Sequence, residues 1–140
     1  MIEIRDLRKS FKAKTGTVTA VDGVSFSARD GEITGLLGPN GAGKTTTLRM
    51  LYTLMSPDAG RVLVDGLDAA SEPTRVRASL GVLPDARGIY KRLTARENIA
   101  YFGALQGLDD RLIAERTERL VSALEMRDFI DRRAEGFSQG

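Results

Sequence analysis

The sequence lacks several residue types and segments, and each absence excludes a class of function. The 140-residue chain contains no cysteine, which excludes disulfides and thiolate metal sites within it. It contains no histidine, which excludes imidazole catalysis and histidine metal ligands. No apolar run approaches the length needed to cross a bilayer, and the start, Met1–Arg5, does not resemble a signal peptide. We therefore expect any membrane role to come through a partner.

The charge balance also indicates little about partners. Lysine and arginine exceed aspartate and glutamate by only two, and the charged residues are scattered along the chain. A nucleic-acid-binding domain normally carries a basic stripe or patch, so this class is not indicated. The hydrophobic fraction of 41% is sufficient for one domain core.

The most specific motif is a glycine-rich loop at residues 38–45, Gly-Pro-Asn-Gly-Ala-Gly-Lys-Thr, which fits the phosphate-binding pattern G-x-x-x-x-G-K-[ST]. The apolar run 33–37 before it predicts a buried strand. A helix is predicted after it, with one apolar side formed by Leu48, Leu51, Leu54 and Met55. Strand, loop and helix in this order are the context that the motif requires.

Each part of this motif has a physical role toward phosphate. Glycines let backbone N–H groups turn toward the phosphate oxygens, and the helix N-terminus presents further N–H groups to the same anion. Lys44 is expected to reach the β- and γ-phosphates, and the Thr45 hydroxyl to ligate Mg²⁺. The alternative is a plain glycine-rich turn between a strand and a helix.

The remaining patterns predict an α/β fold. Alternation of apolar and polar residues predicts antiparallel strands within residues 1–30. Further expected elements are a strand at 61–64 with a tight turn at Asp65-Gly66, a short helix at 72–78 and a buried strand at 80–83.

The last part of the chain is expected to be helical. Thr94 to Glu97 has the form of a capping box, and it opens a helix with Ile99, Phe102 and Leu105 directed inward. Asp109-Asp110 caps a longer helix. Its inward residues are expected to be Leu112, Ile113, Leu120, Val121 and Leu124.

Several segments, in family order, resemble the ATP-binding cassette (ABC) ATPases. The final residues, 136–140, resemble the start of the ABC signature motif, and residues 83–90 lie where that family has its Q-loop. The loop at 38–46 has the sequence typical of the family's phosphate-binding loop. Residues 4–7 and 21–26 are similar to the family's N-terminal strands. The form Phe-Ser-x-Gly is similar to exporters of the sodium-extrusion and drug-resistance type.

This resemblance implies a P-loop NTPase core, incomplete in this chain, with an N-terminal antiparallel β subdomain and a C-terminal helical subdomain. The implied boundaries are residues 1–30 for the β subdomain, 31–85 for the P-loop core and 86–140 for the helical subdomain. Together they form one truncated ABC ATPase domain.

The resemblance also implies roles for single residues. Phe11 would stack on adenine, or be a core residue instead. Asp85 stands at the Q-loop glutamine position, where a carboxylate is a suitable Mg²⁺ ligand, although it is also a common turn residue. Ser138 and Gly140 would contact the γ-phosphate held by a second subunit, and Ser138 would also cap a helix. The implied phosphate cradle is Gly38, Asn40, Gly41, Gly43, Lys44, Thr45 and Thr46.

Parts of the family's catalytic machinery are expected to be missing. The family places its Walker B strand, catalytic glutamate and switch histidine beyond the signature motif, and this chain stops inside that motif. We therefore expect an N-terminal fragment with no catalytic residue other than Lys44. Such a chain should bind ATP and Mg²⁺ and hydrolyse ATP poorly or not at all.

The implied parent function is ATP binding and hydrolysis that drives transport, with export favoured, through a separate membrane subunit. The implied assembly is a dimer of ATP-binding subunits at the cytoplasmic face of the cell membrane, with residues 87–101 as the docking surface. Two alternatives remain open: a soluble ABC-type ATPase that is not tied to transport, and a non-hydrolysing nucleotide-binding module.

Overall fold

A computed structural model describes residues 1–14, 16–83, 88–135 and 137, and divides the chain into two compact units, Met1–Val82 and Leu83–Gly140. The first unit contains the strands β1 (Ile2–Ala13), β2 (Gly16–Ala28), β3 (Ala59–Val64) and β4 (Leu67–Asp68), and the helices α1 (Lys44–Leu51) and α2 (Pro73–Ser79). The second unit contains α3 (Ala95–Leu105) and α4 (Asp110–Ala123).

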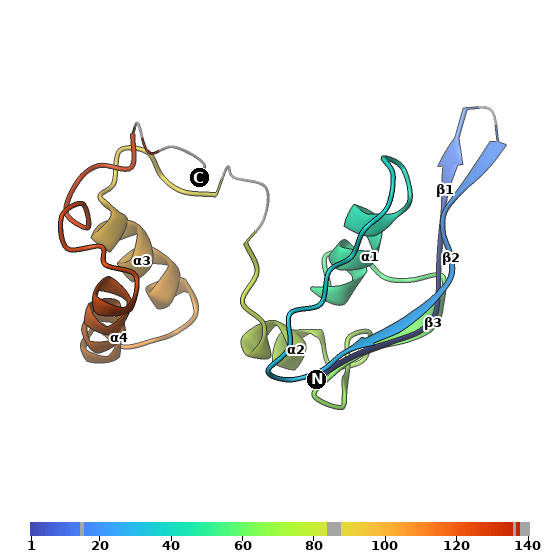
Figure 1. The fold of residues 1–140 in the computed structure, drawn as a ribbon, viewed down its shortest axis with the longest axis horizontal. Coiled ribbons are helices and arrows are strands. Elements are labelled where there is room, and N and C mark those ends of the chain that lie inside the picture. Colours follow the sequence, from blue (N-terminus) through green and yellow to red (C-terminus); the bar gives the residue numbers. More distant parts are fainter. Residues whose placement is uncertain (15, 84–87, 136, 138–140) are drawn as a thin grey trace. The chain divides into compact units, whose positions relative to one another are not determined.

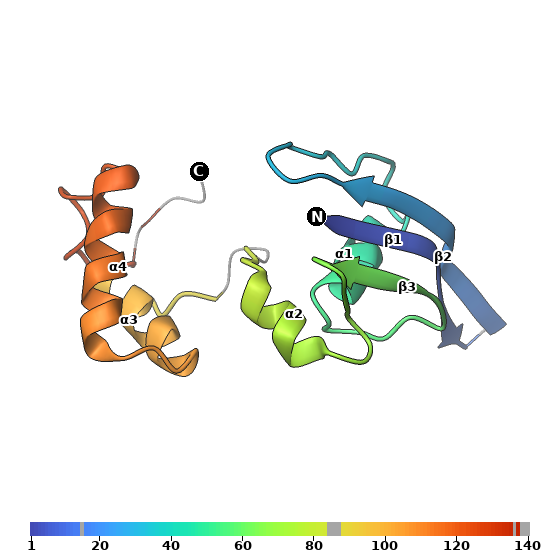
Figure 2. The same cartoon turned by 90° about the horizontal axis from the view of Figure 1, so that it is seen from below.

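The strands of the first unit form one antiparallel sheet in the order β2-β1-β3-β4. Figure 2 shows β1 between β2 and β3. The β1–β2 pair is a long hairpin in which Phe11 lies opposite Val18. Asp65 and Gly66 both have positive φ, 49° and 79°, as a tight hairpin turn requires. The predicted N-terminal strands, the strand at 61–64 and its turn are therefore confirmed.

The core of the first unit lies between this sheet and the helices α1 and α2, which cover one of its faces (Figure 1). Met50 of α1 and Val76 of α2 are almost fully buried there. The strands supply the other side chains of this core, Ile4, Leu7, Val21, Val62 and Val64, and Ala69 follows β4. The sheet and the two helices thus form a two-layer arrangement that holds the start of α1 in place.

Two predicted strands are not formed. Residues 32–39 and 80–83 have no regular secondary structure, and Ile33, Leu37 and Leu83 are more than 90% exposed. A strand needs a hydrogen-bonded neighbour, and no described strand pairs with either segment. Apolar runs at both places were correctly identified, but the assignment as buried strands is wrong.

The predicted apolar side of α1 is also partly wrong. The helix ends at Leu51, and Leu48 and Leu54 are 43% and 69% exposed. Its buried residues are Thr47 and Met50. Met50 faces the sheet and fixes the orientation of the helix, so the two leucines lie away from the core of this unit.

In the second unit both predicted helix starts are confirmed. Thr94 and Glu97 form the expected capping box at α3, and the Asp109 carboxylate accepts a hydrogen bond from the Leu112 N–H at α4. In α4 the predicted inward residues Ile113 and Val121 are buried.

Ile99 and Leu112 are half-buried, but other inward assignments in these two helices are wrong. Four predicted inward residues are more than 40% exposed: Phe102, Leu105, Leu120 and Leu124. Two polar residues, Asn98 of α3 and Thr117 of α4, are buried instead. Each is hydrogen-bonded to nearby backbone: the Thr117 hydroxyl donates to the Ile113 carbonyl oxygen, and the Asn98 side chain bonds to the loop before α3.

Candidate nucleotide-binding site

The glycine loop between residues 38 and 43 has the backbone shape that its sequence requires. Gly38, Gly41 and Gly43 have φ of 155°, 82° and 82°, a range that side-chain-bearing residues rarely adopt. The Ala42 N–H donates to the Pro39 carbonyl oxygen at 3.2 Å, which closes a turn inside the loop. The chain therefore curls immediately before α1 begins at Lys44.

Lys44 lies across this loop. Its Nζ donates hydrogen bonds to the carbonyl oxygens of Gly38 at 2.6 Å and Pro39 at 2.7 Å. An ammonium has three donors, so one remains for an anion at the mouth of the loop. The lysine is thereby held in place before any ligand arrives.

The N-terminus of α1 has free capacity for an anion. Its N-cap residue is Gly43, which supplies no side-chain acceptor, whereas Thr94 and Asp109 cap the other two longer helices. No acidic residue lies in the first turn of α1. The unpaired N–H groups of a first helical turn and the positive end of the helix dipole together favour phosphate. Thr45 is exposed and Thr46 half-buried at this end.

Gly43 joins the loop to the sheet. A methyl group on its α-carbon would collide with the carbonyl oxygen of Ala20 and lie 3.1 Å from Cγ2 of Val21, both in β2. Only a glycine permits this close approach. The sequence indicated that a glycine was needed here, but it did not reveal the contact with Ala20.

Phe11 lies at the far end of the β1–β2 hairpin and is 39% exposed. The Nζ of Lys9 lies 5.8 Å from the centre of its ring, which is a cation–π distance. Phe11 is outside the core cluster, so its ring is accessible for stacking.

The position of Lys9 is set by a residue that the sequence analysis did not identify. The Asp58 carboxylate accepts hydrogen bonds from Lys9 Nζ at 2.6 Å and from the Ser10 N–H at 2.7 Å. These bonds, that of Lys9 first, lower the pKa of Asp58 below its ordinary value. Asp58 is distant from Lys9 in sequence, and no local pattern links the two residues.

Three of the predicted site residues, Asp85, Ser138 and Gly140, lie outside the described residues. Phe137, which precedes Ser138 in the sequence, packs its ring edge-to-face on Phe129 with centroids 5.8 Å apart. Among the described residues, no three histidine, cysteine or acidic side chains converge as metal ligands. The Thr45 hydroxyl is the predicted Mg²⁺ ligand that the structure describes.

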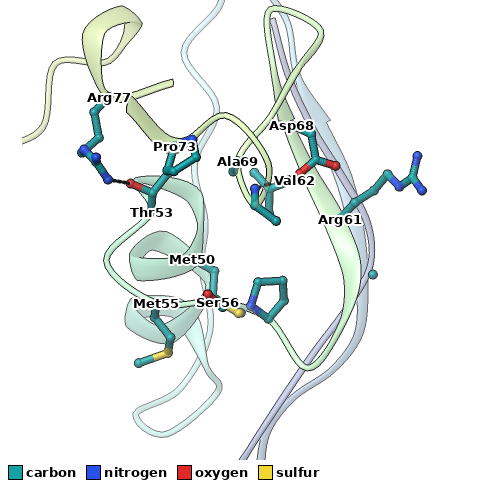
Figure 3. Close-up of a pocket in the computed structure, with 13 residues that line it drawn as sticks. Met50, Thr53, Met55, Ser56, Arg61, Val62, Asp68, Ala69, Pro73 and Arg77 are labelled. Carbon is teal, nitrogen blue, oxygen red and sulfur yellow. Dashed lines mark hydrogen bonds between the residues drawn. The ribbon is translucent and has the colours of Figure 1, made fainter. Parts of the chain in front are cut away.

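A separate cavity of about 310 Å³ is lined by residues that include Met50 of α1, Thr53 and Arg77 of α2 (Figure 3). Arg77 Nη1 donates to the Thr53 hydroxyl at 2.8 Å across its rim. None of residues 38–46, all of which the structure describes, contributes to its lining. This cavity is therefore distinct from the phosphate loop.

Comparisons with known proteins show which family the chain resembles. The chain is 45% identical over its full length to the ABC transporter ATP-binding protein NatA of Bacillus subtilis (strain 168), of which it covers 57%. It is 37% identical over 99% of its length to the doxorubicin resistance ATP-binding protein DrrA of Mycobacterium tuberculosis (strain H37Rv), of which it covers 41%. The chain thus spans about half the length of these relatives.

Solved structures show the same fold. An ATP-binding subunit of an ABC transporter matches 99% of the chain with a TM-score of 0.80 and 26% identity, over 56% of its own length. A cassette solved as a post-hydrolysis dimer bound to ADP and Pi matches with a TM-score of 0.81 over 63% of its length, at 22% identity, which shows the fold alone.

The α/β fold class is confirmed by these structures. Within the described part of the chain, no helix is long and apolar enough to cross a membrane. The family model described as ABC transporter matches residues 21–140. The chain therefore belongs to the ABC transporter ATP-binding family.

Proposed function

We propose that this chain is the ATP-binding part of an ABC transporter subunit, which couples ATP binding and hydrolysis to transport by a separate membrane subunit. The observation that carries the proposal is the arrangement at residues 38–44. Lys44 is held over a loop whose glycines have positive φ, and it lies directly at a helix N-terminus that has no side-chain cap. This combination of a fixed cation and free N–H groups suits a polyphosphate.

In this proposal the nucleotide extends from Phe11 to the phosphate loop. The Phe11 ring stacks on adenine, with Lys9 fixed beside it by Asp58. The phosphates lie against the cradle of residues 38–46, where Lys44 compensates their charge. Thr45 and Asp85 hold Mg²⁺, for which hydroxyl and carboxylate oxygens are suitable ligands.

The site is completed by a second ATP-binding subunit. Ser138 and Gly140 of one subunit contact the γ-phosphate bound by the other, so that two ATP molecules lie between two subunits. The membrane subunit docks on residues 87–101, and the assembly is located at the cytoplasmic face of the cell membrane. Export is the favoured direction, because the relatives include proteins named for doxorubicin resistance.

The same proposal predicts that the isolated chain hydrolyses ATP poorly or not at all. With no histidine in its sequence it has no switch histidine. Lys44 then contributes to binding and charge compensation without a group that activates water. A steady-state ATPase assay of the isolated chain should give a rate indistinguishable from a Lys44→Ala control. Clear hydrolysis that depends on Lys44 would refute this part of the proposal.

Isothermal calorimetry with ATP and Mg²⁺ tests the site itself. A charged hydrogen bond contributes about 1.5–3 kcal/mol, so Lys44→Ala should weaken ATP binding by about tenfold or more. Lys91→Ala, a lysine exposed in the second unit, serves as the matched control and should bind like the parent chain. Equal affinity of Lys44→Ala and Lys91→Ala would overturn the site assignment.

A further inference from the structure

The segment that precedes the signature motif is bound to the N-terminus of α3. The N–H groups of Ala95 and Arg96 donate to the carbonyl oxygens of Arg132 and Ile130, at 3.2 and 2.9 Å. Because first-turn N–H groups have no partner within their own helix, these carbonyls satisfy them. Residues 130–132 are therefore held by the start of the helix.

The Arg96 side chain strengthens the same connection. Its Nε donates to Asp131 Oδ1 at 2.7 Å, and its Nη1 donates to Glu118 Oε1 of α4 at 2.7 Å. One guanidinium thus joins α3, α4 and the segment before the signature. The hydrogen bond from Arg96 lowers the pKa of Asp131 below its ordinary value.

A second connection lies further along the chain. The N–H groups of Ala134 and Glu135 donate to the carbonyl oxygens of Leu93 and Lys91, each at 2.9 Å. Residues 91–96 and 130–135 thus run beside one another in opposite directions, and Thr94 is bridged to Arg133.

Asn98 holds the first of these two segments in shape. Its side chain is buried, with the residue 5% exposed. Its Oδ1 accepts from the Tyr90 N–H at 2.8 Å, and its Nδ2 donates to the carbonyl oxygens of Tyr90 at 3.1 Å and Thr94 at 2.9 Å. An apolar residue here would leave buried backbone groups of the loop without partners.

We propose that Arg96 and Asn98 are positioning residues for the signature motif: they fix residues 130–135, which lead into that motif, against the N-terminus of α3, and the ATP-dependent pairing of the motif with a second subunit requires this anchor. Neither side chain touches nucleotide in this scheme. The inference rests on the proposed function, because it assumes that the signature motif of one subunit meets the phosphate loop of another.

A fluorescent reporter at the signature motif makes the proposal testable. The chain has no cysteine, so Gln139→Cys provides a single labelling site for a solvent-sensitive dye. Labelled chain is mixed with an excess of unlabelled chain, and emission is followed against the concentration of unlabelled chain with ATP and Mg²⁺. Without substitutions, emission should change with ATP only when the unlabelled chain retains Lys44.

The variants are Arg96→Gln, Arg96→Lys and Asn98→Ala in the labelled chain. We expect Arg96→Gln and Asn98→Ala to raise the half-saturating concentration of unlabelled chain about threefold or more, and Arg96→Lys to recover part of the loss, because lysine reaches one carboxylate. ATP affinity at the chain's own phosphate loop should stay unchanged by calorimetry. The matched control is Arg119→Gln, whose side chain pairs only with Glu115 on α4 among the described residues.

The outcomes separate the two proposals. If the unsubstituted pair gives no ATP-dependent signal although calorimetry shows ATP binding, the two-subunit site is refuted, and the positioning role with it. If that signal is present but Arg96→Gln matches Arg119→Gln, the positioning role alone is overturned. Asn98→Ala counts only if its circular dichroism matches the parent chain. If it does not match, Arg96→Gln alone decides the positioning role, because Arg96 is only half-buried.

Discussion

A methyl group on Gly43 would point into the backbone carbonyl oxygen of Ala20, which ties the phosphate loop to strand β2. The loop is therefore positioned by the sheet as well as by its own turn. Gly41 gives a contrast within the same loop, because it has the same φ of 82° but no atom lies within 4 Å of where its Cβ would be. A comparison of the two positions therefore separates the cost of backbone strain, which both share, from the cost of the collision at Gly43.

The first prediction compares Gly43→Ala with Gly41→Ala. A left-handed backbone costs an alanine about 1–2 kcal/mol, and both variants carry this penalty. Gly43→Ala also has to move β2 or the start of α1, so its loss of unfolding free energy should be at least about twice that of Gly41→Ala. Urea unfolding followed by circular dichroism measures both, and similar losses would contradict the Gly43–Ala20 contact.

The second prediction concerns Phe11. Stacking of a base on an aromatic ring contributes about 1–3 kcal/mol, so Phe11→Ala should weaken ATP binding by about fivefold to 150-fold. Phe11→Tyr keeps a ring and should bind ATP nearly as the parent chain does. Val18→Ala, opposite Phe11 in the hairpin, controls for loss of an exposed apolar side chain. Calorimetry in which Phe11→Ala and Val18→Ala bind ATP equally well would exclude the stacking role.

Local patterns predicted local features of this fold well. The glycine loop, the turn at Asp65-Gly66 and the capping box at Thr94 each depend on a few adjacent residues, and the structure contains all three. Their conformations follow from backbone preferences and short-range hydrogen bonds, which a sequence carries directly.

Features that depend on distant neighbours were predicted less well. The apolar segments at 33–37 and 80–83 have the composition of strands, but pairing decides whether a strand forms, and pairing is not a local property. The link between Lys9 and Asp58 spans 49 residues. Asn98 is polar and was not expected in a core, and only its backbone partners at Tyr90 and Thr94 explain its burial.

The third prediction uses the acid side of the stability profile. The Asp58 carboxylate has a lowered pKa in the folded chain, so it contributes stability above its unfolded pKa, near the ordinary 3.8, and loses it as the pH falls through the lower, folded value. Asp58→Asn should therefore be less stable than the parent chain at pH 7. The difference should shrink as the pH falls below about 4.

Urea unfolding at several pH values measures this difference. Lys9→Met removes the first cause of the shift and should reproduce most of the effect of Asp58→Asn at pH 7. The double variant should then lose little more than either single variant, because both changes remove the same pair. Additive losses would show that the two residues act independently.

The fourth prediction concerns the start of α3. The Thr94 hydroxyl accepts from the Glu97 N–H at 3.1 Å, and the Glu97 carboxylate accepts from the Thr94 N–H at 2.7 Å. Loss of an N-cap costs about 1 kcal/mol, so Thr94→Ala should destabilise the second unit by about that amount, whereas Thr94→Ser should retain most of the cap.

Hydrogen exchange of the Glu97 amide reports this cap directly. Thr94→Ala should accelerate its exchange by about fivefold, which corresponds to the same free energy if exchange follows local opening. Ser122→Ala, on the exposed side of α4, serves as the control and should leave that amide unchanged. Because Thr94 also lies opposite Arg133, faster exchange in Thr94→Ala should extend to the amides of Ala134 and Glu135. Acceleration confined to Glu97 would mean that the cap and the segment before the signature motif open separately.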